Sequence, residues 1–105
     1  MEKGTIEIRF IDTNKTITMN HVFSYIKKKD VDNRDMMLIS IKDLNHFDCM
    51  NEYNDLIEVK GKTLSNKKYP DGCYYTCSSC SITRAQKRLG YNEYLFICNT
   101  DVIEE

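Results

Sequence analysis

An alternation of apolar and polar residues near the start of the chain is the feature that most constrains its fold. Within Thr5–Phe10, the residues Ile6, Ile8 and Phe10 are apolar and their neighbours are polar or charged. This period of two places the apolar side chains on one face of a β-strand. A strand with one apolar face needs a sheet and a covering layer, so the pattern predicts a sheet-containing fold.

The residues that follow predict an antiparallel hairpin. Asp12, Thr13 and Asn14 form a polar turn cluster, and the alternation resumes over Thr16–Met19 with Ile17 and Met19 on the apolar side. Strands joined by so short a connection pair with each other.

Two later segments carry helix signals. Asn20 is a candidate N-cap for a helix from about His21 to Lys29, in which Val22, Tyr25 and Ile26 share one face and lysines occupy the last turn. Thr83 and Gln86 match a capping box, and Gly90 stands where a left-handed terminator belongs. These signals predict a second, short helix from Arg84 to about Leu89.

The remaining order predicts further strands separated by turns. Tyr69–Gly72 contains proline followed by Asp-Gly, which is typical of a tight turn. The other expected elements are a central strand at Met36–Ile41, a loop or short helical turn at Asp43–Asn54, an exposed loop at Lys62–Lys68, and strands at Leu56–Val59, Cys73–Ile82 and Tyr94–Cys98. We therefore expect a single α+β domain over residues 1–105, with a mostly antiparallel sheet of five to six strands and two short helices in the order ββαβββαβ.

Composition suggests the cellular setting. The chain has 105 residues, of which 41% are hydrophobic and 30% charged, and it contains neither a membrane-length apolar run nor a signal-peptide pattern. Its five cysteines are odd in number and irregularly spaced, which favours reduced thiols over a disulfide framework. We expect a cytoplasmic protein that does not enter the membrane. The scarcity of alanine and proline is typical of AT-rich genomes, including those of phages and viruses.

The cysteines Cys73, Cys77 and Cys80 leave three interpretations open. A zinc site could combine the thiols of Cys77 and Cys80 with His46 and Cys49, because C-x2-C and H-x2-C spacings suit zinc. A redox pair could use Cys77 and Cys80 ahead of the predicted helix, whose dipole would lower a thiol pKa. The third interpretation is that the thiols are packed as small hydrophobic side chains.

Strand geometry favours packing of the thiols over chelation. In a regular strand Cys77 and Cys80 point to opposite faces, and Cys73 and Cys77 lie about 13 Å apart. We therefore predict no metal, no cofactor and no catalytic residue, and we expect this chain not to be an enzyme.

Charge is distributed unevenly although the net charge is only −1. The segment from Asp43 to Val59 has five acidic and no basic residues, whereas Lys60–Arg88 has seven basic residues and one acidic residue, Asp71. Tyrosines lie among the basic residues. The candidate partner-binding residues are Lys67, Lys68, Tyr69, Tyr74, Tyr75, Arg84, Lys87 and Arg88.

Two kinds of partner fit this charge pattern. Separated acidic and basic surfaces with tyrosines are typical of protein interfaces, so we expect a small non-enzymatic protein that occupies a partner protein's surface, as viral or phage accessory and inhibitory proteins do. The alternative is a nucleic-acid-binding domain that uses the basic Lys60–Arg88 stretch, with or without a structural zinc ion.

Overall fold

The protein is built from β-strands that form one continuous antiparallel sheet. The computed structural model describes residues 1–42 and 56–105, with the backbone alone at 83–87. Its strands are β1 (Thr5–Phe10), β2 (Lys15–Met19), β3 (Val22–Lys29), β4 (Asp35–Lys42), β5 (Ile57–Lys62), β6 (Tyr74–Arg88), β7 (Tyr91–Cys98) and β8 (Ile103–Glu104). The strand order is β2-β1-β5-β6-β7-β4-β3, and β8 pairs with β6.

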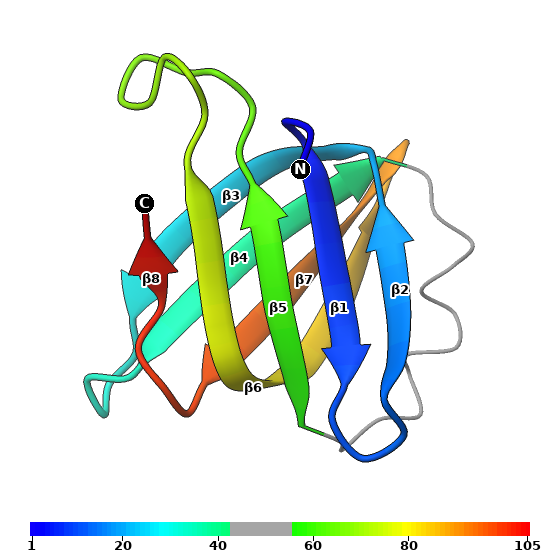
Figure 1. Cartoon of the computed structure of the whole chain (residues 1–105), viewed down its shortest axis with the longest axis vertical. Coiled ribbons are helices and arrows are strands. Elements are labelled where there is room, and N and C mark those ends of the chain that lie inside the picture. Colours follow the sequence, from blue (N-terminus) through cyan, green and yellow to red (C-terminus); the bar gives the residue numbers. More distant parts are fainter. Residues whose placement is uncertain (43–55) are drawn as a thin grey trace.

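The long strand β6 converts this sheet into two layers. Figure 1 shows β2, β1, β5 and the first half of β6 in one layer, with β7, β4 and β3 crossing diagonally behind them. The first half of β6 pairs with β5 and the second half with β7. Register shifts against each neighbour leave an extra residue in β6, and such bulges bend a strand. The bent strand therefore joins the two layers.

Side chains from both layers fill the space between them. The fully buried residues include Ile6 and Ile8 of β1, Val59 of β5, Ile39 of β4 and Phe96 of β7. In β1 the inward positions Ile6, Ile8 and Phe10 alternate with half-buried ones, so the period of two seen in the sequence marks the core face of this strand correctly.

The N-terminal hairpin agrees with the prediction. β1 pairs antiparallel with β2, with Ile8 opposite Ile17 and Ile6 opposite Met19. Asn14 in the turn adopts a positive φ of 56°, which asparagine tolerates better than most residues. The Tyr69–Gly72 turn is also confirmed, since the Gly72 N–H donates to the Tyr69 carbonyl at 3.0 Å and Gly72 has a φ of 78°.

The predicted helix from His21 to Lys29 is wrong, because Val22–Lys29 forms strand β3 and pairs with β4. A register shift between Val22 and Ser24 leaves Phe23 as an extra residue in β3. The bulge places Val22 and Tyr25, three positions apart, against the same core. This spacing imitates the i, i+3 pattern of a helix.

The predicted helix from Arg84 to Leu89 is also wrong, because β6 runs unbroken to Arg88. Gly90 has a φ of 82° in the two-residue connection between β6 and β7. A hairpin turn and a helix terminus both require a residue with positive φ, so the glycine by itself did not distinguish them.

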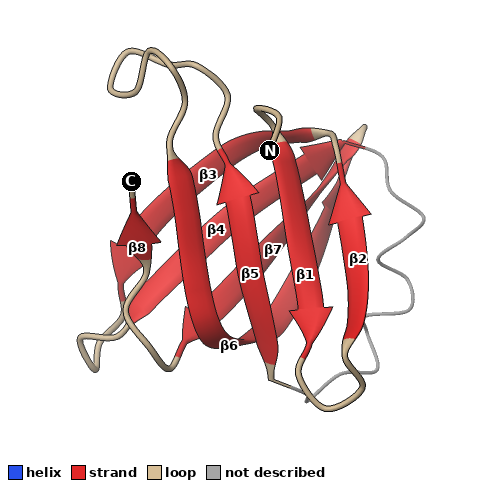
Figure 2. Ribbon diagram, in the orientation of Figure 1, coloured by secondary structure: helices blue, strands red, loops and turns tan. Residues whose placement is uncertain are grey.

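These two corrections change the fold class from α+β to all-β. Figure 2 shows strands and loops alone over the described residues. The sheet contains eight strands instead of five or six. The predicted strand at Met36–Ile41 corresponds to β4, which lies between β3 and β7. The described part of the chain also contains no helix long and apolar enough to cross a membrane.

Candidate functional site

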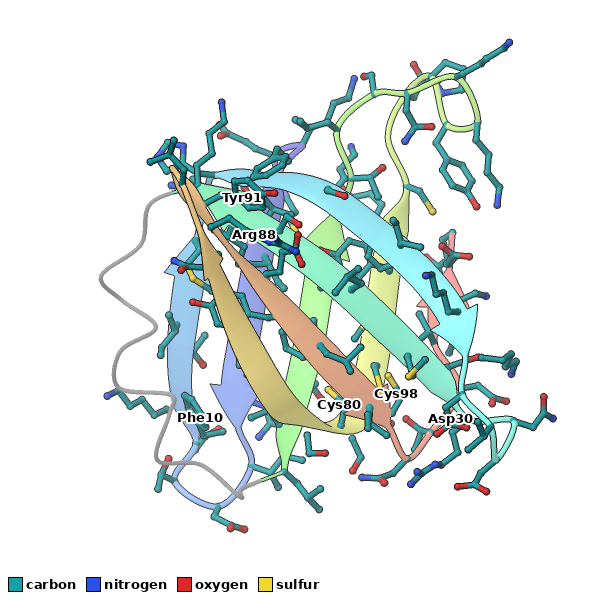
Figure 3. All side chains as sticks on the ribbon, turned by 180° about the vertical axis from the view of Figure 1, so that it is seen from behind. Phe10, Asp30, Cys80, Arg88, Tyr91 and Cys98 are labelled. Atoms are coloured by element: carbon teal, nitrogen blue, oxygen red, sulfur yellow. The ribbon has the colours of Figure 1, made fainter. Side chains whose placement is uncertain are left out.

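Three buried thiols converge where β6 bends. The sulfur atoms of Cys77, Cys80 and Cys98 all lie within 4.8 Å of one another, and each residue is at most 1% exposed. Cys77 and Cys80 belong to β6, and Cys98 ends β7. We call these three residues the thiol cluster. Figure 3 shows Cys80 and Cys98 beside each other inside the layers.

A β-bulge brings Cys77 and Cys80 to the same face. In the pairing of β5 with β6, Val59 lies opposite Cys77 and Ile57 lies opposite Cys80. Two residue steps on β5 thus match three on β6, and the extra residue reverses the alternation of side chains. The expectation that these cysteines point to opposite faces is therefore wrong.

Strand pairing adds the third thiol. Cys80 lies directly opposite Cys98 in the pairing of β6 with β7. The sequence predicted a buried Cys98 but gave no sign of its partner, because residues 18 positions apart meet only through sheet register. His46 and Cys49, the other zinc candidates, lie outside the described residues. Cys73 is buried at the start of β6 and is not a member of the cluster.

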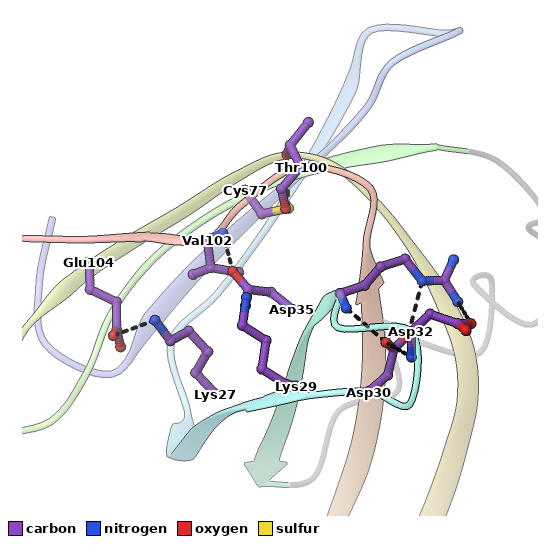
Figure 4. A network of polar contacts seen from close by, with 10 residues as sticks. Lys27, Lys29, Asp30, Asp32, Asp35, Cys77, Thr100, Val102 and Glu104 are labelled. Atoms are coloured by element: carbon purple, nitrogen blue, oxygen red, sulfur yellow. Dashed lines mark hydrogen bonds and ion pairs between the residues drawn. The ribbon is translucent and has the colours of Figure 1, made fainter.

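The cluster contains one thiol that favours the charged form. The pKa of Cys77 lies well below its usual range because Cys80 and Cys98 donate hydrogen bonds to its sulfur. The same contacts raise the pKa of Cys80, which is also desolvated. Cys77 further approaches the Ser79 carbonyl at 3.4 Å and the Thr100 hydroxyl at 3.6 Å. Figure 4 shows Cys77 beside Thr100.

The cluster lies close to the surface on its Cys77 side. Cys77 contributes to the lining of a cleft of about 220 Å³, together with residues of β5, β6 and the chain around β8. Thr100 is exposed, and its hydroxyl accepts a hydrogen bond from the Ser78 hydroxyl at 3.0 Å. The contacts of the Cys77 sulfur with Thr100 bring the cluster within one residue of the surface.

A second candidate site is a groove along β3. Two adjoining hollows of about 170 and 250 Å³ share Tyr25, Thr63 and Asn66 in their lining. One wall is the consecutive run Val22–Lys27 and the other is the segment from Thr63 to Tyr69. Side chains of consecutive strand residues point in opposite directions, so a groove lined by all of them must follow the strand's edge. We call it the β3 groove.

Tyr25, which lines both hollows of the β3 groove, is stacked on a buried tyrosine, Tyr75. The rings of Tyr25 and Tyr75 are stacked, with centroids 4.0 Å apart and planes 16° apart. Tyr75 in turn covers Gly61, where an added Cβ would lie 2.2 Å from the ring. The glycine thus leaves room for Tyr75, and Tyr75 positions Tyr25.

Tyr75 is fully buried, so this predicted partner-binding residue is not available on the surface of the folded protein. The other predicted residues separate into two groups. Lys67, Lys68, Tyr69 and Tyr74 lie in or beside the loop before β6, whereas Arg88 lies at the opposite end of that strand, as Figure 3 shows. Arg84 and Lys87 also lie in the second half of β6, where the structure describes only their backbone.

The site residues that the sequence did not reveal are Tyr25 and Cys98. The sequence placed Tyr25 in a predicted helix. Its actual position at the edge of the sheet depends on which strands pair with each other. No family model, curated protein or solved structure matched the chain. The functional proposal below therefore depends on the geometry of this structure.

Proposed function

We propose that this protein binds an extended, acidic segment of a partner protein in the β3 groove, where the segment adds a strand to the edge of β3. The observation that carries the proposal is a strand edge that forms one wall of a groove and pairs with no further strand among the described residues, although at its start the Val22 N–H donates to the Gly4 carbonyl. β3 ends the strand order, and β4 is its one partner among the described strands. Exposed edges of this kind accept further strands.

Polar groups in the groove also favour a peptide ligand. Burial, followed by the nearby Glu104 carboxylate and its hydrogen bond, raises the pKa of Tyr25, so its phenol remains a donor at neutral pH. The contact with Glu104 does not have the geometry of a full hydrogen bond, and among the described residues no other group accepts from this buried hydroxyl. A peptide carbonyl in the groove could therefore accept from the Tyr25 hydroxyl.

The second wall of the groove is held by its own hydrogen bonds. Asn66 and Tyr69 bond to each other through both backbone and side chain, at 3.0 and 2.7 Å. At the base of this segment, Thr63 accepts from the Cys73 N–H through its hydroxyl and donates its own N–H to the Cys73 carbonyl. A preorganised wall lowers the entropy that binding must overcome.

Charge around the groove favours an acidic ligand. Lys27 forms an ion pair with Glu104 at 3.3 Å, and this pair connects β3 to β8 at one end of the groove, as Figure 4 shows. Among the ion pairs of the described residues, none engages Lys28, Lys67 or Lys68. These unneutralised ammonium groups would attract carboxylates.

The nucleic-acid alternative loses part of its support. It depended on Lys60–Arg88 as one basic surface with interleaved tyrosines. The structure separates Lys67 and Lys68 from Arg88 by the length of β6, and it buries Tyr75. The remaining basic group around Lys67 is compatible with either an acidic peptide or a phosphate backbone, so the experiment must distinguish them.

The direct test is selection of peptides from a random displayed library, followed by NMR titration of the selected peptides. We expect enrichment of acidic sequences with alternating apolar residues, and amide shift changes concentrated at Val22–Lys27 and Thr63–Tyr69. Substitution Lys68→Glu should weaken binding by about threefold to tenfold, because surface ion pairs contribute up to about 1 kcal/mol each. Lys15→Glu on β2 is the matched control and should leave affinity unchanged.

Two results would overturn the proposal. One is a failure to enrich any peptide, together with shift changes at the same residues on addition of single-stranded oligothymidylate, which would favour nucleic acid. The other is peptide binding that perturbs residues away from β3 and leaves the Lys68→Glu and Lys15→Glu variants equal.

A further inference from the structure

The thiol cluster differs from the rest of the core in its composition. Three sulfur atoms lie within 4.8 Å of one another, supplied by two strands, while the neighbouring core positions are mainly aliphatic or aromatic. Packing alone requires apolar volume and does not require that three thiols meet. Thiolates that converge in this way are typical ligands of soft cations.

We propose that Cys77, Cys80 and Cys98 bind one zinc ion, with the three thiolates as protein ligands and a water molecule at the fourth position. Zinc–sulfur bonds of about 2.3 Å place tetrahedral sulfur ligands about 3.8 Å apart. Sulfur atoms that are at most 4.8 Å apart reach this spacing with adjustments of about 1 Å or less. Oxygen-seeking ions such as calcium and magnesium would not choose three sulfur ligands.

The bulge in β6 brings the sulfur atoms of Cys77 and Cys80 to one face of the strand. Between these two residues, the Ser79 carbonyl accepts a hydrogen bond from the Asn99 N–H at 2.8 Å. This bond connects the strand segment between the two ligands to the residue that follows Cys98.

Charge and proton balance define what binding requires. Each thiol that is protonated in the free protein releases its proton to the buffer when the zinc–sulfur bond forms, so affinity should rise with pH. Three thiolates and one Zn²⁺ leave a net charge of −1. The exposed Thr100, whose hydroxyl lies 3.6 Å from the Cys77 sulfur, marks the side from which water would reach the fourth position.

Cobalt and zinc titrations of the full chain test the site. After treatment with a chelator and a reductant, addition of Co²⁺ should produce the visible absorption of tetrahedral cobalt and sulfur-to-cobalt charge transfer, with one equivalent at saturation. Zn²⁺ should displace the cobalt. Substituting any of the three ligands, as in Cys80→Ser, should weaken binding by more than about 100-fold, since even outer-shell changes cost 10–100-fold.

Cys73→Ser is the matched control, because Cys73 is equally buried and lies outside the cluster. This variant should bind cobalt like the original chain, and zinc should raise its melting temperature but not that of Cys80→Ser. Native mass spectrometry of the unsubstituted protein gives an independent readout and should show the mass of one added zinc ion.

The proposal fails if the reduced, folded protein shows no cobalt absorption and no zinc mass. It fails equally if Cys73→Ser and Cys80→Ser bind cobalt alike. A thiol assay that loses two reactive groups in air, without metal binding, would indicate a disulfide and a redox role instead. None of these outcomes depends on whether the β3 groove binds a peptide.

Discussion

At the scale of single residues, Asp35 connects parts of the chain that are distant in sequence. Its carboxylate accepts a hydrogen bond from the Val102 N–H at 2.8 Å and forms an ion pair with Lys29 at 2.7 Å. The hydrogen bond from Lys29 is the main reason that the pKa of Asp35 lies below its ordinary value, while burial opposes this effect. Figure 4 shows how this residue links β3, β4 and the segment before β8.

The lowered pKa of Asp35 predicts that the folded state loses stability in acid. The charged carboxylate stabilises the folded state above the pKa of the unfolded chain, near 3.8, and this contribution is lost as pH falls below that value. Asp35→Asn should lower the free energy of unfolding by about 1.5–3 kcal/mol at pH 7, as for hydrogen bonds to charged groups. Urea unfolding at pH 7 and at about pH 3 measures this difference.

The difference between Asp35→Asn and the original chain should shrink at about pH 3, because below 3.8 the unfolded chain binds a proton at this carboxyl more readily than the folded state does, which reduces the stabilisation. Asp12→Asn, in the exposed β1–β2 turn, should change stability by less than about 0.5 kcal/mol at either pH. A loss of stability on Asp35→Asn that is the same at both pH values would contradict the role of the charge.

At the scale of elements, strand β6 determines both the layer arrangement and the thiol cluster. Its bulges displace the register against β5 and against β7. Bulges increase local twist and bend the strand, which allows one strand to belong to both layers. The number of residues between Cys77 and Cys80 therefore determines the register of β6, and the identity of their side chains has less effect.

Deleting Ser78 should remove the extra residue, so that two residue steps on β6 match two on β5. Cys77 and Cys80 would then stay on one face, as in a regular strand, but the bend with which β6 joins the two layers would be lost. We expect a loss of more than about 3 kcal/mol in the free energy of unfolding, measured by urea denaturation. Ser78→Ala keeps the register and should change stability by less than about 1 kcal/mol. Equal stabilities of the two variants would show that the bulge is dispensable.

At the scale of the whole molecule, the sheet joins distant parts of the chain. β1 pairs with β5, and β4 pairs with β7. In both pairings, the residues that face each other are separated by about 50 positions in the sequence. The entropy of closing such loops must be overcome before the strands can pair. The two layers must therefore form together.

This topology predicts slow folding for a chain of this size. Sheets with mainly non-local pairing fold in milliseconds to seconds, and helical proteins of similar size fold faster. Stopped-flow refolding from urea can follow tyrosine fluorescence, since the chain has seven tyrosines and no tryptophan. Refolding that is complete within the mixing time would contradict this expectation. The Ser78→Ala variant provides a comparison with unchanged topology.

The sequence predicted the fold best where strands are regular. β1, β2 and β4 were located from alternation or apolar runs, and the Tyr69–Gly72 turn followed from its proline and glycine. Prediction failed at β3 and at the second half of β6, where a bulge or a glycine produces the same local signal as a helix. It could not locate the β3 groove, whose two walls come from separate parts of the chain.

The sequence by itself determined which side chains would be buried in the regular strands, because alternation depends only on local backbone geometry. Tertiary structure alone decided that Val22–Lys29 is a strand, that Gly90 closes a hairpin, and that Cys77, Cys80 and Cys98 meet. The physical reason is that a bulge is defined by the partner strand: an extra residue exists only relative to the register of another part of the chain.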